Sequence, residues 1–237
     1  MDTPAIEQYV SGAQTVIERS GSTDRAVVRN TVRETWRWMW KDTADRVVPF
    51  ILTSALYSRA TGTGLERLGM RRVNLPHELA IGVVAGVPMA AVAIWFRGRI
   101  APRYALPTPS DQVLQSAFYL VVNAPVEELL WRAVAQTAAI DLLGRVPRLA
   151  PVAPAAGWGA TTLAFGLYHR LGNWNWKAVA GVTAAGALFG ALYEFRRPRR
   201  SLVVPTIVHG FATAGFLSWG DAALHARHMA ESRKRSK

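Results

Sequence analysis

The chain has 237 residues, a formal net charge of +12 and no cysteine, and 50% of its residues are hydrophobic. Without cysteine it has neither a disulfide framework nor a thiol nucleophile. Its arginines lie mostly in the tails and between long apolar runs. This distribution is typical of basic segments beside a membrane and argues against a nucleic-acid-binding protein. We therefore expect membrane lipid as a partner, and no nucleic acid.

Residues 1–45 form a polar N-terminal segment that we expect to be helical in part. Near its end, Trp36, Trp38 and Trp40 cluster with basic residues just before the first apolar run. Amphipathic rings of this kind favour the headgroup level of a bilayer. The cluster therefore predicts an interfacial helix that anchors the chain and does no chemistry.

Residues 46–224 form the predicted membrane helical domain. A helix needs roughly 17–25 predominantly apolar residues to cross the hydrocarbon core. Val47–Ser58 is short for this and crosses only if its flanks lengthen the helix, whereas Leu79–Phe96 is a full span without charge. Residues 112–143 exceed one simple span. Pro125 lacks a backbone donor within that stretch, so we predict a break or kink there.

The second half of the chain adds three predicted spans. Residues 149–168 and 178–193 carry no charge, and residues 201–220 have His209 as their one titratable group. A basic tail follows, residues 225–237, and we expect its charged end, residues 231–237, to be disordered. These runs predict an all-α protein, a polytopic transmembrane helical bundle of about 5–7 membrane helices. The composition, rich in Ala, Arg and Val, suggests an integral protein of a bacterial cell membrane.

Three charged residues interrupt the longest apolar run. Glu127, Glu128 and Arg132 are the only formal charges between residues 112 and 140. A charge at the bilayer centre costs about 2.5–3.5 kcal/mol, so charges in such a place predict a functional site. On a helix, Glu128 and Arg132 share a face while Glu127 points about 100° away. We therefore expect one carboxylate in an ion pair with the arginine and the other available as a general base.

Two histidines lie on other apolar runs and complete a candidate site. His169 ends the run that begins near residue 149, and His209 lies near the middle of the last run, one turn before Thr213. A carboxylate and two imidazoles can hold and deprotonate a water, directly or through a metal. Their separations are too long for a local motif, so packing of three helices must assemble the site. Small residues between 181 and 191 would let these helices approach closely.

In this order, Glu127-Glu128-x-x-x-Arg132, Phe165-x-x-x-His169 and His209 resemble the motifs of the CPBP family. These intramembrane proteases include the type II CAAX prenyl endopeptidases and the bacteriocin-processing and abortive-infection-like proteins. The resemblance covers the motif-bearing core, about residues 118–219. It implies an intramembrane endopeptidase that hydrolyses a peptide bond in a membrane-associated protein or peptide.

The resemblance also implies roles for individual residues. Glu127 would activate the hydrolytic water with the help of His169. Glu128 and Arg132 would support the site.

The remaining implied roles concern the oxyanion of the reaction. Asn173 matches a polar position four residues after the first histidine in some members of the family. His209 would bind water or stabilise the oxyanion, and the residue four positions later, commonly asparagine, would donate a hydrogen bond to it. Here that residue is Thr213, which has a shorter reach. Losing one oxyanion donor costs about 10²–10³ in rate, so Thr213 implies lower activity or a shifted substrate geometry.

Cofactor use is open at this stage. Glu127, His169 and His209 could hold one zinc ion and leave an open position, because two imidazoles and a carboxylate suit zinc. The same residues could also activate water with no cofactor, and we favour this glutamate-dependent, metal-free chemistry over a metalloprotease.

Two other classes of function remain. A catalytically weak or inactive scaffold or immunity protein of the same fold would explain Thr213 in place of asparagine. A transporter or proton relay would also place Glu and His in a membrane. The sequence shows no internal repeat of the kind common in transporters, which argues against the second.

Overall fold

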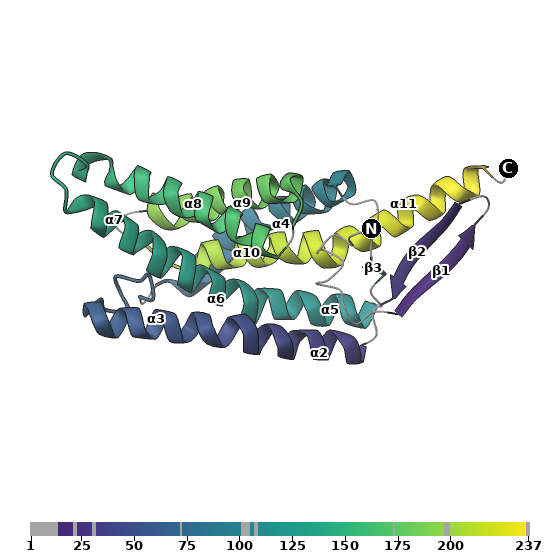
Figure 1. Cartoon of the computed structure of the whole chain (residues 1–237), viewed down its shortest axis with the longest axis horizontal. Coiled ribbons are helices and arrows are strands. Elements are labelled where there is room, and N and C mark those ends of the chain that lie inside the picture. The colour runs from purple at the N-terminus through teal and green to yellow at the C-terminus, as the bar shows by residue number, and fades with distance from the viewer. Residues whose placement is uncertain are drawn as a thin grey trace.

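The computed structural model is a bundle of helices that run roughly along one long axis, with a small sheet at one end (Figure 1). The all-α bundle predicted from the apolar runs is confirmed, and the sheet is a minor addition to it. The structure describes residues 14–20, 23–29, 32–71, 73–100, 105–106, 109–172, 174–196 and 200–235.

The sheet is built mainly from the N-terminal segment, which we expected to be helical in part and in which we predicted no strand. Strands β1 (Gln14–Ser20) and β2 (Thr23–Arg29) form an antiparallel hairpin. Strand β3 (Ala105–Leu106) adds to β2 in parallel. The pairing of the hairpin runs from Gln14 with Arg29 to Ser20 with Thr23.

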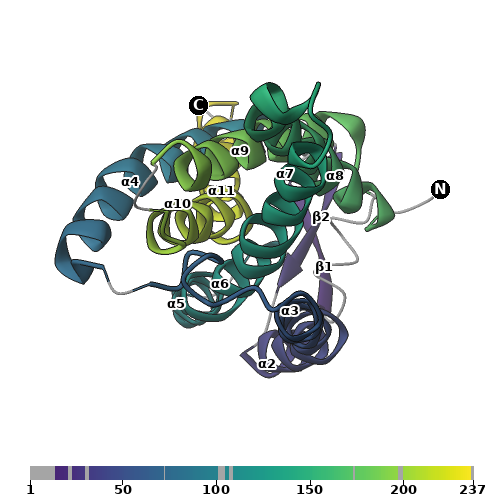
Figure 2. The same ribbon diagram turned by 90° about the vertical axis from the view of Figure 1, so that its left-hand side faces the viewer.

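The first helical rod joins the predicted interfacial segment to the short apolar run. It consists of α2 (Val32–Asp42), the π-helical turn η1 (Thr43–Val47) and α3 (Val48–Thr61). The rod ends at Gly62, whose φ of 66° is easily adopted only without a side chain. Polar flanks therefore lengthen the run that was too short for a span. Figure 2 shows α2 and α3 at the edge of the bundle, beside α5 and α6.

The second rod contains the two glutamates and does not break at Pro125. Pro125 lies at the start of α6, directly after the π-helical turn η2, and the backbone is helical on both sides, so the chain does not break there and a kink stays a prediction. The rod changes instead between α-helical and π-helical geometry. It consists of α5 (Pro109–Phe118), η2 (Tyr119–Asn123), α6 (Ala124–Glu128), η3 (Leu129–Gln136) and α7 (Thr137–Gly144).

Helices α4 (Leu75–Ile100) and α10 (Val203–Ala214) pack closely along their length. Gly82 and Gly86 of α4 make this possible. A Cβ built on Gly82 would come within 2.7 Å of Ile207, and one on Gly86 within 2.7 Å of Phe211. Small residues one turn apart allow two helix backbones to approach in this way.

The remaining helices complete the bundle. Helix α10 continues through the π-helical turn η5 (Gly215–Trp219) into α11 (Gly220–Arg235), so the charged end of the tail, which we expected to be disordered, is helical as far as Arg235. A short 3₁₀ turn, η4 (Ala150–Val152), leads into α8 (Ala153–Leu171), and α9 (Trp176–Glu194) packs against α8.

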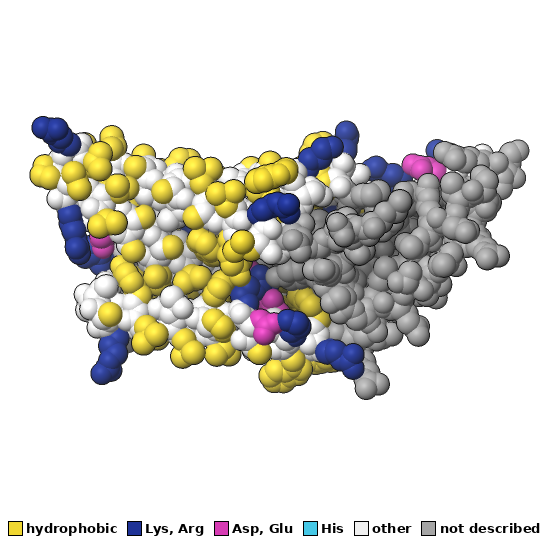
Figure 3. Space-filling view, in the orientation of Figure 1, with side chains coloured by type: hydrophobic (Ala, Val, Ile, Leu, Met, Phe, Trp, Pro, Cys, Tyr) yellow, Lys and Arg dark blue, Asp and Glu magenta, His cyan; other side chains and the backbone are white. Residues whose placement is uncertain are grey.

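The surface of the bundle is apolar. Two described helices are long and apolar enough to cross a membrane, α4 with a mean hydropathy of 2.2 and α9 with 1.2. Only 17% of the apolar window of α4 is buried, whereas the core helix of a soluble protein would be mostly buried. Figure 3 shows hydrophobic side chains over much of the visible face, with Lys and Arg mainly toward its edges. The other predicted spans are individually shorter or less apolar, partly because π-helical turns divide them.

Candidate active site

Two adjacent carboxylates on α6 are almost completely buried. Glu127 is 3% exposed and Glu128 is 0% exposed. Helix α6 lies between the π-helical turns η2 and η3. Short π-helical insertions alter the direction in which side chains leave a helix, and they are frequent at functional sites. The helix that carries the two glutamates therefore departs from regular α-helical geometry on both sides of them.

Glu128 is held between two cationic or imidazole partners. Its Oε2 accepts a hydrogen bond from Nε of Arg132 at 3.2 Å, as their spacing indicated. Its Oε1 lies 2.8 Å from Nδ1 of His209 on α10. The guanidinium of Arg132 also lies over the Phe165 ring, 4.8 Å from its centroid. Glu128 thus connects its own rod to α10, with both carboxylate oxygens engaged.

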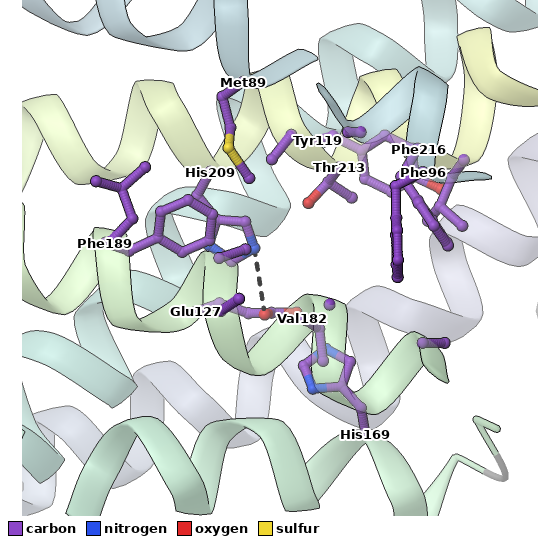
Figure 4. A pocket seen from close by; sticks show the side chains of 18 of the residues that line it. Met89, Phe96, Tyr119, Glu127, His169, Val182, Phe189, His209, Thr213 and Phe216 are labelled. Atoms are coloured by element: carbon purple, nitrogen blue, oxygen red, sulfur yellow. Dashed lines mark ion pairs between the residues drawn. The ribbon is translucent and has the colours of Figure 1, made fainter. Parts of the chain in front are cut away.

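Glu127 has a different set of neighbours. Its Oε1 accepts hydrogen bonds from Nη1 of Arg46 at 2.6 Å and from Nδ2 of Asn123 at 3.4 Å. Its Oε2 lies 3.7 Å from Nε2 of His209, and Figure 4 marks this pair with a dashed line. One oxygen is therefore fixed by donors from η1 and η2, while the other faces the second histidine.

His169 near the end of α8 has a defined tautomer. Its Nδ1 lies 2.8 Å from the backbone oxygen of Phe165, which can only accept a hydrogen bond. Nδ1 therefore carries a hydrogen, and in the neutral ring Nε2 is an acceptor. The rings of Phe165 and Trp174 each pack edge-on against His169, with centroids 4.9 Å away. These contacts fix the ring orientation.

The candidate residues meet at a cavity of about 410 Å³. Glu127, His169, His209 and Thr213 all line it, and so does Arg46. In Figure 4 the glutamate lies between the two histidines, and the labelled Phe96 and Phe216 occupy another side of the same space. Much of the remaining wall consists of small and apolar side chains of α4 and α9. Asn173 lies outside the described residues.

Residues 109–215 match the model of a protein family described as type II CAAX prenyl endopeptidase Rce1-like. This segment is an Rce1-like domain. The family is one of membrane-embedded CAAX-type proteases, so the resemblance noted in the sequence is confirmed and the apolar bundle is a membrane protein. No curated protein and no solved structure matches the chain.

The matched residues include the candidate site residues of the cavity but not the whole of its wall. Glu127, His169 and His209 lie within the matched residues, whereas Arg46 precedes them by more than one helix. Sequence analysis missed Arg46, because no local spacing relates residue 46 to residue 127. It also missed Asn123, although a position four residues before Glu127 on a helix could have been found.

The predicted zinc ligands do not form a metal site in this geometry. Within the described ranges, no three His, Cys, Asp or Glu side chains are placed to hold a metal ion. Oε1 of Glu127 faces the Arg46 guanidinium at 2.6 Å. A cation beside a ligand carboxylate disfavours a second cation there. The residues around the cavity therefore do not fit a zinc ion.

A separate ion pair lies just after the C-terminal end of α9. Arg196 donates to both carboxylate oxygens of Glu78, at 2.8 and 2.7 Å. The hydrogen bonds to Glu78 raise the pKa of Arg196 above its already high usual value. The arginine therefore stays charged at every physiological pH. The contact joins the segment after α9 to the start of α4.

Proposed function

We propose that this protein is an intramembrane endopeptidase that cleaves a peptide bond in a membrane-associated protein or peptide. The observation that carries the proposal is the convergence of Glu127, His169 and His209, from three helices of an Rce1-like domain, on one cavity. A structural ion-pair network alone would not need an open side. A buried base beside two imidazoles and a substrate-sized space is suited to hydrolysis.

In the proposed reaction, Glu127 is the general base. A water between its Oε2 and Nε2 of His169 gives a proton to the carboxylate, and its oxygen forms a bond to the scissile carbonyl carbon. The carbonyl π electrons move to the oxygen, which becomes an oxyanion. Collapse of this intermediate breaks the C–N bond, and the proton on Glu127 passes to the leaving amine. Water is thus consumed, and a carboxylic acid and an amine are formed.

The other residues would act on charge and orientation. His209, with Nδ1 toward Glu128, would donate from Nε2 to the oxyanion in its doubly protonated form. Thr213, also at the cavity, would donate a further hydrogen bond. Arg132 would keep Glu128 in place.

The cavity wall supports an apolar substrate segment. Met89, Val92 and Phe96 of α4 line the space together with small residues of α9. Apolar walls with a few convergent polar groups are usual for binding sites of partly apolar ligands. We propose a membrane-bound peptide or a leader peptide in a bacterial cell membrane as the substrate, with membrane lipid around the bundle.

The proposal is tested by cleavage of a quenched peptide library by the purified protein in detergent, in parallel with and without a chelator. We expect Glu127→Gln to lower the rate by about 10²–10⁴, the usual contribution of a general base. Glu66→Gln, which changes an exposed glutamate, is the matched control and should cleave like the wild type. Cleavage of a confirmed substrate by Glu127→Gln at the wild-type rate would refute the mechanism. Loss of wild-type cleavage with the chelator would refute metal-free chemistry.

A second candidate is a weakly active or inactive scaffold of the same fold. The observation that favours it is Thr213 at the cavity, where the family commonly has asparagine. For a scaffold, a cellular phenotype of the gene would survive replacement of both His169 and His209. For a protease, it would be lost.

A further inference from the structure

The closest charged partner of Glu127 comes from outside the Rce1-like domain. Arg46, on the π-helical turn η1, lies with Nη1 2.6 Å from Oε1 of Glu127 and with Nη2 2.6 Å from Oδ1 of Asp42. Its side chain is 12% exposed, and the side chains of Glu127 and Asp42 are 4% and 6% exposed. The arginine therefore bridges two nearly buried carboxylates and also lines the cavity.

The helical turn that carries Arg46 explains how it reaches the site. In η1 the hydrogen bonds span one residue more than in an α-helix, which widens the turn and changes the direction of its side chains. Just upstream, Trp38 packs edge-on against Phe118 and Tyr119, with centroids 5.4 and 5.7 Å away. Thr35 donates to Asp111 at 3.0 Å. These contacts fix α2 against α5 and set the height of Arg46 beside α6.

The rod that contains Arg46 continues as α3 along the edge of the bundle. It packs against α5, α6 and η3, at the edge seen in Figure 2. In α3 most side chains face outward, including Leu52 and Leu56, which are 56% and 66% exposed. An arginine on such a peripheral helix has no packing reason to be directed inward. Its contact with Glu127 is the specific feature.

The pair gives Glu127 two properties that a general base in a membrane needs. A carboxylate removed from water is strongly disfavoured unless it is paired, and the guanidinium supplies this pairing. It also holds Oε1, so that Oε2 is the oxygen that faces His209. When Glu127 accepts a proton, Arg46 keeps Asp42 as its partner and is not left with an unbalanced charge.

We propose that Arg46 is a positioning residue of the active site, which keeps Glu127 ionised and turns its reactive oxygen to the cavity. The proposal rests on the proposed endopeptidase function. It makes the N-terminal rod part of the catalytic unit, so that the Rce1-like domain by itself lacks one member of its site.

The first test uses activity with chemical rescue in the full chain. Arg46→Ala should lower the cleavage rate by about 10²-fold, the scale expected when a catalytic group is misplaced. Arg46→Lys should retain part of the activity, and millimolar guanidinium chloride should restore part of it to Arg46→Ala. Sodium chloride at the same ionic strength should not. Arg59→Ala, on the exposed face of the same rod, should behave like the wild type with and without guanidinium.

Two results would overturn the proposal. One is wild-type cleavage by Arg46→Ala. The other is a loss in Arg46→Ala that guanidinium does not restore, because an empty guanidinium site beside Glu127 should accept the free ion. In both cases the endopeptidase function would still be supported, provided that the wild type cleaves the substrate and Glu127→Gln does not.

The second test needs no substrate and separates this proposal from the proposed function. Thermal unfolding in detergent is measured for Arg46→Ala, Glu127→Gln and the double variant. A direct pair predicts that the double variant loses less stability than the sum of the single losses, because the single variants each leave a buried partner behind. Additive losses would overturn the pairing. Should the wild type cleave no peptide, this cycle still decides whether Arg46 supports Glu127.

Discussion

The polar cluster around Glu127 and Glu128 differs from the Arg97–Asp221 pair, although both bury charges between apolar helices. Arg97 on α4 donates from Nε to Oδ1 of Asp221 on α11 at 2.6 Å, and both side chains are 2% exposed. Neither residue lines the cavity, whereas Glu127 does. Burial and pairing alone therefore do not distinguish the charge that we propose to be catalytic from a structural one. The two are distinguished by the cavity, which Glu127 lines beside His169 and His209.

The largest effect on stability is expected for Glu128. Glu128→Leu removes the partner of both Arg132 and His209 and leaves a buried arginine without its carboxylate. Breaking a buried pair in this way costs about 3–5 kcal/mol. We expect a large fall in the thermal unfolding midpoint in detergent, together with loss of cleavage by the protein that remains folded. Glu66→Leu, at an exposed site, is the control. Normal cleavage per folded molecule would show that Glu128 is only structural.

A smaller effect, confined to stability, is expected for Asp221. Asp221→Asn keeps a hydrogen-bonding group beside Arg97 but removes the negative charge, so we expect a loss of about 2 kcal/mol, in the range of hydrogen bonds to charged groups. Cleavage per folded molecule should stay at the wild-type level, as measured by activity normalised to the folded fraction. If this variant were inactive while folded, the contrast between the two clusters would fail.

The smallest effect is expected at Thr213. Thr213→Asn would restore the longer amide donor at the cavity, and we expect about a tenfold rise in cleavage rate, equivalent to about 1.4 kcal/mol of transition-state stabilisation. The measurement is kcat for a confirmed substrate, with Thr206→Asn, outside the cavity lining, as the control on the same helix. A lower rate would mean that this site is adapted to threonine.

The sequence was sufficient for features that depend on local spacing. Apolar runs located the helices, and the four-residue interval between Glu128 and Arg132 indicated their ion pair. The hairpin of β1 and β2 was missed, although Gly21-Ser22 between two short β-prone runs is a turn signal. The polar composition of residues 1–45 was taken to argue against strands, although the residues on both sides of Gly21-Ser22 include β-branched side chains.

Features that depend on contacts between distant segments were not accessible in the same way. Arg46 and Glu127 are 81 residues apart, and their meeting depends on how one rod packs against another. The π-helical turns follow from such packing too, since the composition of residues 119–123 does not differ from that of an ordinary apolar helix. Pro125 was therefore expected to break or kink the helix, whereas the backbone stays helical from η2 into α6.

The π-helical turn η2 has a consequence for how the chain can change in length. It separates the residues of α5 that contact α2, such as Asp111, from Glu127 on α6. Each residue of a helix turns the chain by about 100°, so deletion of one residue from 119–123 would rotate α5 by that angle relative to the glutamates. Either the contacts to α2 or the direction of Glu127 would then be lost. A change in the length of this stretch would therefore alter the orientation of α5 relative to Glu127, which a substitution does not do by itself.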